Sequence, residues 1–143
     1  MIGLFEATIA SVVALAALMP IVASMGGNAG TQTMTVAVRA LAMKELDTQN
    51  AWRVLRKEIL VGLINGFAFA VIAGAVTLGW FGDVVIGLVI GAAMVINLLV
   101  AGLAGAAIPL RLSRLGIDPA VASAVVLTTV TDVVGFLAFL GLA

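Results

Sequence analysis

One carboxylate lies inside a segment that is too apolar to solvate it. Asp132 is the only charged residue of the stretch 119–143. A charge at the centre of a membrane costs roughly 2.5–3.5 kcal/mol on insertion scales, and such residues normally face a pathway, a partner or a bound ion. Thr128 and Gly135 lie one helical turn before and after Asp132 and share its helix face. Because no Lys or Arg lies inside any apolar stretch, the partner of Asp132 is a cation, a proton or a hydrogen-bond donor on a neighbouring helix.

A second polar segment follows Pro20. This residue has no backbone N–H, so the carbonyl of Ala16 loses its helical partner. Residues 24–32 then place three glycines among small side chains that carry oxygen atoms. Loosened backbone at membrane depth is tolerated only against protein or a water-filled cavity. The candidates for binding an ion or lining its path are therefore Pro20, Ser24, Gly26, Gly27, Asn28, Gly30, Thr31 and Gln32.

Glu6 extends this pattern if the helix is continuous. A helical rotation of about 100° per residue places Glu6, Pro20 and Asn28 in one stripe, with the carboxylate near the outer end. Two alternatives remain open. Glu6 can sit only at the outer interface, and the glycines can mark a helix end that enters a loop.

The composition excludes most classes of function. Of the 143 residues, 64% are hydrophobic and 10% are charged, whereas soluble domains average about 45–50% and about 25%. This excludes a cytosolic enzyme domain, a disordered chain and a nucleic-acid-binding protein. The chain has no Cys and no His, which excludes disulfides and metal sites built on thiolate or imidazole. Any metal must be held by oxygen, which favours hard cations such as Mg²⁺ or Ca²⁺.

Four apolar stretches are long enough to span a membrane. They cover residues 4–25, 59–80, 84–108 and 119–143. The sequence therefore predicts an all-α, polytopic helical bundle in contact with membrane lipid. The pairs Gly62/Gly66 and Gly87/Gly91 predict close helix packing, and the mid-span amides Asn65 and Asn97 predict either interhelical hydrogen bonds or a polar path.

The placement of charge predicts the topology. All seven basic residues lie within residues 39–58 and 109–118, and the connection 79–83 has none. Basic residues near span ends collect on the cytoplasmic side, so both basic loops are expected in the cytoplasm and both termini outside, in a multi-pass protein of the cell (inner) membrane. A chain that starts outside without a cleavable signal predicts a further spanning segment upstream of Met1, in a longer protein.

The motifs resemble those of one known family. Residues 20–32 resemble the Pro-x-x-x-x-x-Gly-Gly-Asn-x-Gly-x-Gln signature of the MgtE magnesium channels, and Arg39-Ala40-Leu41-Ala42 follows as in that family. Asp118-Pro119-Ala120-x-x-Ser123 and Thr128-Thr129-x-x-Asp132-x-x-Gly135 resemble its last helix. The resemblance covers essentially the whole chain.

The resemblance implies a homodimer with five transmembrane helices per subunit. Residues 1–143 would form the ion-conducting domain with the second to fifth helices, and the first helix and the cytosolic regulatory domains lie outside this sequence. The pore is expected on the dimer interface. A central Mg²⁺ site is expected at Asp132, supported by Thr128, Asn28 and the carbonyls of Gly27 and Gly30. The expected pore lining adds Glu6, Pro20, Ser24, Gly26, Thr31, Gln32 and Gly135.

These expectations combine into a magnesium-selective channel that is not an enzyme and has no nucleic-acid partner. A divalent ion gains about 4.6 kcal/mol from 100 mV, twice the value for one charge, so uptake needs no coupling ion. Two alternatives remain. In a proton-coupled transporter, Asp132 would exchange protons with the metal, although no second mid-membrane ionisable residue supports this. In a helical scaffold subunit without transport, Asp132 would only bond to a partner helix.

Overall fold

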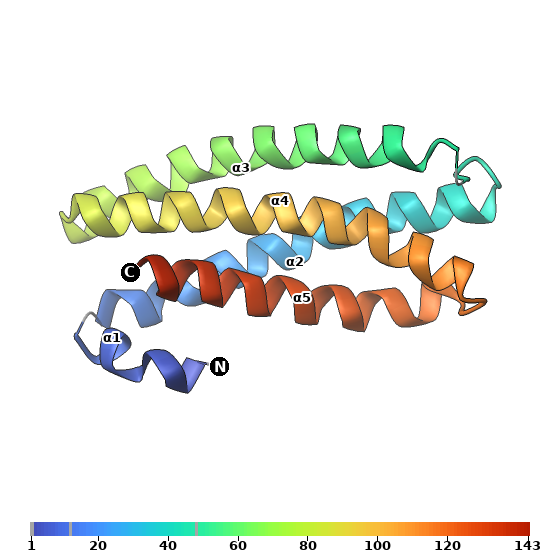
Figure 1. Cartoon of the computed structure of the whole chain (residues 1–143). Coiled ribbons are helices and arrows are strands. Elements are labelled where there is room, and N and C mark those ends of the chain that lie inside the picture. The colour runs from blue at the N-terminus through green and yellow to red at the C-terminus, as the bar shows by residue number, and fades with distance from the viewer. Residues whose placement is uncertain (1, 12, 48) are drawn as a thin grey trace.

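A computed structural model describes residues 2–11, 13–47 and 49–143, and this part of the chain is helical without a strand. The elements are η1 (Ile2–Phe5), α1 (Glu6–Ser11), α2 (Val13–Ala42), α3 (Ala51–Phe81), α4 (Val84–Arg114) and α5 (Pro119–Leu142), as Figure 1 shows. Helices α2 to α5 are long and apolar enough to cross a membrane. This confirms the all-α class and the predicted number of spans.

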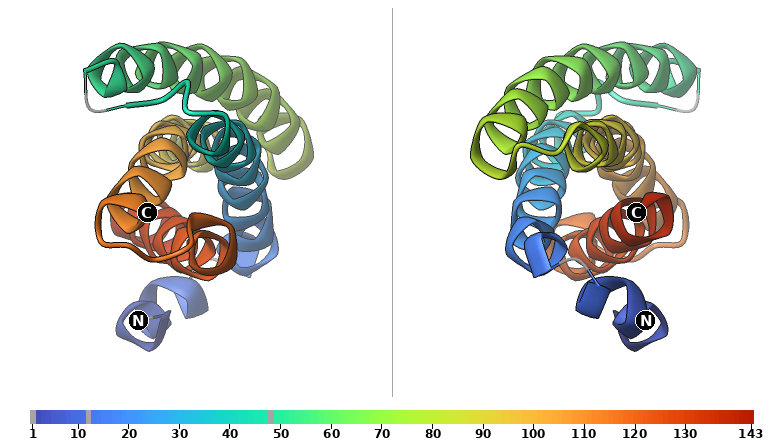
Figure 2. Two further views of the ribbon diagram at one scale, coloured as in Figure 1. Left: turned by 90° about the vertical axis from the view of Figure 1, so that its right-hand side faces the viewer. Right: turned by 90° about the vertical axis from the view of Figure 1, so that its left-hand side faces the viewer.

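Helix α4 lies at the centre of the bundle. It contacts α2, α3 and α5, whereas α3 packs mainly on α4 and α2 packs also on α5. The end-on views in Figure 2 show α3 on one side of α4, with α2 and α5 on the other side and the N-terminal segment outside them. The outward faces of α2 and α5 are therefore not covered by another long helix.

Small residues let α3 approach α4 closely. A Cβ on Gly66 would lie 3.0 Å from the Cα of Val95, and a Cβ on Gly87 would lie 3.2 Å from the carbonyl oxygen of Gly74. A Cβ on Gly62 would lie 3.1 Å from the carbonyl oxygen of Leu98. The predicted packing role of the spaced glycines is confirmed.

Local signals in the sequence define two of the helix junctions. Gly82 ends α3 in the left-handed conformation with a φ of 67°, which glycine adopts without steric cost. Asp83 then caps α4, because its carboxylate accepts from the N–H of Val85 at 2.8 Å. Asp118 caps α5 in the same way, by accepting from the N–H of Ala120 at 2.9 Å.

The predicted boundaries of the first span are wrong. Helix α2 begins at Val13, passes through Pro20 and the glycines, and ends at Ala42. Its 30 residues give a length of about 45 Å, already enough for a bilayer with its headgroups. The N-terminal segment does not extend this helix, because Phe5 and Ile9 pack against the core of the bundle instead. The glycines therefore do not end the helix, and the single stripe from Glu6 to Asn28 does not exist.

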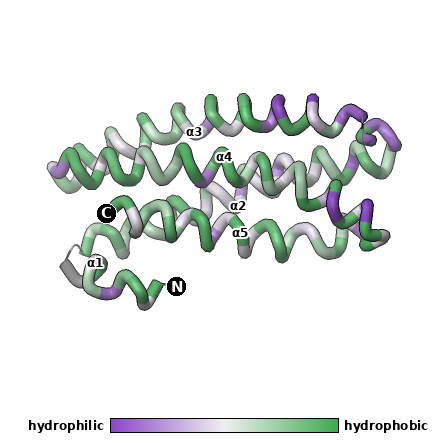
Figure 3. The backbone as a smooth tube through the Cα atoms, in the orientation of Figure 1, coloured by the Kyte–Doolittle hydropathy of each residue, from purple (hydrophilic) through white to green (hydrophobic). Residues whose placement is uncertain are grey.

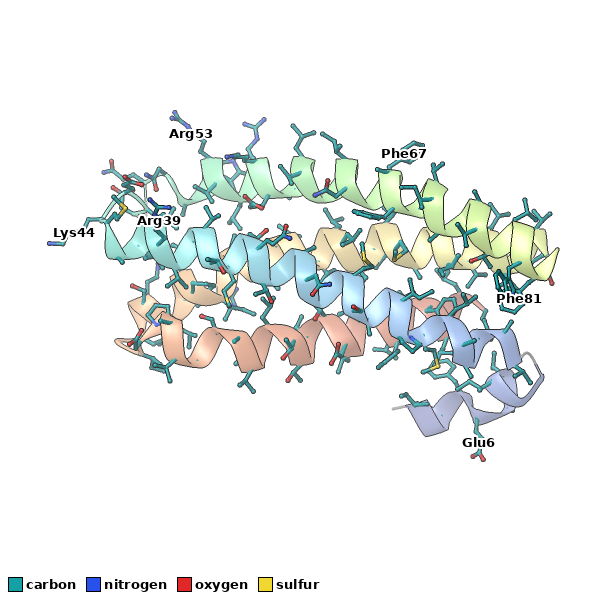
Figure 4. All side chains as sticks on the ribbon, turned by 180° about the vertical axis from the view of Figure 1, so that it is seen from behind. Glu6, Arg39, Lys44, Arg53, Phe67 and Phe81 are labelled. Carbon is teal, nitrogen blue, oxygen red and sulfur yellow. The ribbon has the colours of Figure 1, made fainter. Side chains whose placement is uncertain are left out.

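The basic loops are shorter than predicted. Helices α2 and α3 leave only residues 43–50 between them, and α4 and α5 leave only 115–118. Most of the basic residues therefore lie on helix ends, where their long side chains can cover apolar surface and keep the charged groups in water. Figure 4 places Arg39, Lys44 and Arg53 at one end of the bundle and Phe81 at the other, and Figure 3 shows most of the hydrophilic chain at the same basic end. The side of the membrane stays a prediction.

Candidate functional site

Helices α2 and α5, which carry the two motifs, lie side by side. Their motifs are at the same height along the bundle. A Cβ on Gly30 of α2 would lie 3.0 Å from the Cδ1 of Leu127 on α5. Gly26 of α2 and Gly135 of α5 both adjoin the side chain of Asn97 on α4. The glycine segment of α2 therefore faces the segment of α5 that carries Asp132, with the two helices running in opposite directions.

Helix α5 separates its polar residues between two faces. Its buried stripe recurs every four residues and consists of Ser123, Leu127, Thr131, Gly135 and Phe139. Thr128 and Asp132 lie beside this stripe and are exposed. Gly135, predicted to line the pore, is on the buried side of α5 in the single chain. Its role in the pore stays a prediction.

Helix α2 shows the same division. Val22, Gly26 and Gly30 are buried toward α4 and α5, and Gly27 is half-buried. The exposed residues of α2 include most of the predicted site residues: Pro20, Ser24, Asn28, Thr31 and Gln32. Of these, Gln32 lies toward α3, where it lines a small cavity with Asn65. Asn28, Thr31, Thr128 and Asp132 are thus all accessible in the single chain, on two adjacent helices.

The exposed threonines are oriented to accept hydrogen bonds. Thr31 donates its hydroxyl proton to the carbonyl oxygen of Gly27 at 2.8 Å. Thr128 donates to the carbonyl oxygens of Ala124 and Val125 at 3.0 and 3.2 Å. Because a hydroxyl has one proton and two lone pairs, each oxygen retains lone pairs for a cation or for the water molecules around it.

The two predicted carbonyl ligands already have neighbours in the single chain. The carbonyl oxygen of Gly27 accepts the hydroxyl proton of Thr31. The carbonyl oxygen of Gly30 lies 2.6 Å from the point where a Cβ on Gly105 would sit, so it packs against α4. Ion binding by these carbonyls stays a prediction.

A single chain offers one carboxylate at this level. Among the described residues, no three of His, Cys, Asp and Glu lie close enough to hold a metal ion together. Glu6 lies on α1, and Figure 4 shows its side chain directed away from the bundle. Its pore-lining role stays a prediction. One copy of this face therefore combines a single carboxylate, Asp132, with neutral hydroxyl and amide oxygens.

The prediction of an interhelical hydrogen bond is confirmed for Asn97. This residue is fully buried, and its Nδ2 donates to the carbonyl oxygen of Val22 at 2.7 Å. The site prediction did not include Asn97, although an amide in an uncharged span was the available signal. Asn65 is exposed and lines a cavity of about 60 Å³ with Gln32 and Thr33.

The sequence of the chain is similar to those of known transporters. A family model described as "MgtE: Divalent cation transporter" matches residues 19–142. The chain is 39% identical over 140 residues to a protein named magnesium transporter MgtE from Thermus thermophilus, which covers 97% of the chain and 31% of that protein. Proteins of the same name from Enterococcus faecalis and Bacillus subtilis are 37% and 33% identical, over 100% and 99% of the chain and 32% of each relative. The chain thus spans about a third of the length of these relatives.

Proposed function

The chain belongs to the MgtE family of divalent cation transporters, and from that premise we propose that it forms the pore of a magnesium-selective channel. In this proposal two copies of the chain associate through the exposed faces of α2 and α5. Mg²⁺ passes between them, down its electrochemical gradient. The basic ends of the helices lie in the cytoplasm of the cell membrane.

The exposure of Asp132 carries the proposal. Its helix is apolar enough to cross a membrane, and the outward face of α5 has no long helix over it. An ionised carboxylate in contact with lipid is costly, so intramembrane charges face protein or a water-filled cavity. A second copy of the same face covers both Asp132 side chains and encloses an aqueous path between them.

The chemistry of the face suits a hydrated divalent ion. Two Asp132 carboxylates brought together repel one another, and a divalent cation between them offsets that repulsion. Mg²⁺ gives up its waters reluctantly and usually retains several. The oxygens of Thr128, Thr31 and Asn28 can then accept hydrogen bonds from the retained waters, which agrees with the threonine orientations in the single chain.

The electrical driving force favours a channel over a coupled carrier. A divalent ion gains about 4.6 kcal/mol from 100 mV, twice the value for one charge. Asp132 is also the one carboxylate near the middle of a span in the part of the chain that the structure describes. A proton-coupled cycle would have to work through this single group.

Flux through liposomes tests the proposal. The chain is reconstituted around a magnesium-sensitive dye, and Mg²⁺ is added outside under an inside-negative potential. We expect wild-type flux without a proton gradient and near-complete loss in Asp132→Asn, which keeps the side-chain shape. The matched control is Asp83→Asn, because asparagine caps a helix as well as aspartate does and Asp83 lies at the far end of the bundle.

Three results would contradict the proposal. Equal flux in wild type and Asp132→Asn would remove Asp132 from the path. Flux that requires a proton gradient would show a coupled transporter. A folded wild-type chain that passes no ion would leave a scaffold subunit.

A further inference from the structure

Asn97 lies where three helices meet. It belongs to α4, it is 0% exposed, and its Nδ2 donates to the carbonyl oxygen of Val22 on α2. Its Oδ1 is buried and has no hydrogen-bond partner among the described residues. Most buried polar atoms are paired, so an unpaired one in a well-packed core calls for a specific explanation.

Two glycines make room for this side chain. A Cβ on Gly26 of α2 would collide with the amide of Asn97. A Cβ on Gly135 of α5 would lie 2.7 Å from the Nδ2 of the same amide. The amide therefore occupies the space that side chains at these two glycines would fill, and it contacts both α2 and α5.

This junction is close in sequence to the proposed ion ligands. Asn28 lies two residues after Gly26, and Asp132 lies three residues before Gly135. A change in the packing of α2 or α5 against Asn97 would move one of these side chains relative to the other. Asn97 itself is enclosed by protein, so it acts on them through the helices.

We propose that Asn97 is a positioning residue for the ion site. Its amide sets the separation and register between the glycine segment of α2 and the Asp132 segment of α5, and so sets the affinity for the ion. The inference rests on the proposed function, because it assumes that these two segments hold the ion. Groups that orient metal ligands from behind typically account for about 10–100-fold in metal affinity or activity.

The test replaces Asn97 by a side chain of similar size without a donor. In Asn97→Leu, we expect the Mg²⁺ concentration for half-maximal flux to rise about tenfold or more. The matched control is Asn65→Leu, which removes the other mid-span amide from an exposed position on α3. This control is expected to keep the wild-type concentration dependence. If the Asn97→Leu variant does not insert into the membrane, Asn97→Ser takes its place. The Mg²⁺ concentration for half-maximal flux is expected to rise in this variant too.

A distance measurement separates positioning from stability. The chain has no cysteine, so spin labels attach only at cysteines introduced at Thr35 of α2 and Val121 of α5, two exposed positions outside the proposed ligands. Labelled chain is diluted with unlabelled chain so that only distances within one copy are recorded. We expect one narrow distance in wild type and in Asn65→Leu, and a shifted or broadened one in Asn97→Leu.

A glycine variant adds a second arm. Gly135→Ala is expected to lower the melting temperature, because its Cβ meets the amide. Adding Asn97→Ala removes that obstacle, so the double variant should recover melting temperature relative to Gly135→Ala. It should not recover the wild-type Mg²⁺ dependence, since alanine at position 97 has no amide to donate to Val22.

The outcomes distinguish this inference from the function on which it rests. If the Asn97 variants shift neither the α2–α5 distance nor the Mg²⁺ dependence, Asn97 only fills space and the inference is wrong. The same holds if they lower the melting temperature alone. Asp132→Asn is measured in parallel: a loss of flux there, with wild-type behaviour at Asn97, overturns only the positioning role. Unchanged flux in Asp132→Asn overturns the proposed function itself.

Discussion

Substitution of Gly105 tests the contact between α2 and α4 behind the candidate site. A Cβ at this position would lie 2.6 Å from the carbonyl oxygen of Gly30, 3.0 Å from the Cβ of Thr33 and 3.2 Å from the backbone nitrogen of Met34. Two of these three neighbours are backbone atoms, which cannot rotate away. Gly105→Ala must therefore push α2 away from α4 at the level of Gly30.

The magnitude follows from comparison with a glycine in open space. Overpacking a well-filled core typically costs about 1–3 kcal/mol. Replacing glycine by alanine in a helix gains up to about 1 kcal/mol wherever there is room. Gly79 on α3 has no atom within 4 Å of its hypothetical Cβ, so Gly79→Ala makes the same helix gain without a clash. The free energies of unfolding of the two variants should therefore differ by about 1–3 kcal/mol, with Gly105→Ala the less stable.

Unfolding in mixed micelles of increasing denaturing detergent, followed by helical circular dichroism, measures this difference. Wild type and both variants are compared at one protein-to-lipid ratio, because association of copies makes stability depend on concentration. Equal midpoints for Gly105→Ala and Gly79→Ala would refute the close approach of α2 and α4. A more stable Gly105→Ala would refute it as well.

Three further predictions concern the site and the topology. Gly27→Leu should abolish flux with little change in melting temperature, because no atom lies within 4 Å of the hypothetical Cβ of Gly27 in the single chain; loss of folding in this variant would speak against an open face. Thr128→Val should weaken ion binding by about 0.5–1.5 kcal/mol, the usual net value of one hydrogen bond, whereas Thr129→Val, which removes an equivalent hydroxyl from another face, should not; equal effects would show a helix effect and no role in the site. Single cysteines in 79–83 should react with an impermeant thiol reagent from outside and those in 43–50 only from the cytoplasm, and the reverse pattern would invert the topology.

Much of the fold could be predicted from the sequence because the bilayer imposes simple rules. Long apolar runs predict spans, and the ends of α3, α4 and α5 coincide with strong local signals. Gly82 supplies a left-handed turn, and Asp83 and Asp118 supply caps. The first span was misplaced because hydropathy does not distinguish a continuous helix from a short one that folds back. The packing of Phe5 on the bundle decides that question, and this contact is tertiary.

The candidate site was predictable in its residue types but less so in its geometry. The sequence identifies Asp132 and the glycine segment, since a carboxylate and exposed backbone are unusual in an apolar span. It does not show that Gly135 turns inward while Asp132, three residues away, stays exposed. Gly135 adjoins the amide of Asn97, whose partner Val22 lies 75 residues earlier in the chain. The fit of one amide against glycines on two other helices has no local signature.

The position of a divalent ion relative to Asp132 tests the central claim most directly. Crystals of the chain grown with Mn²⁺ in place of Mg²⁺ would show the ion by its anomalous scattering. We expect a peak on a two-fold axis between two copies, with the Asp132 carboxylate of each copy facing it directly or through a water molecule. A dimer formed through other helices, or a peak remote from Asp132 with none on that axis, would contradict the account.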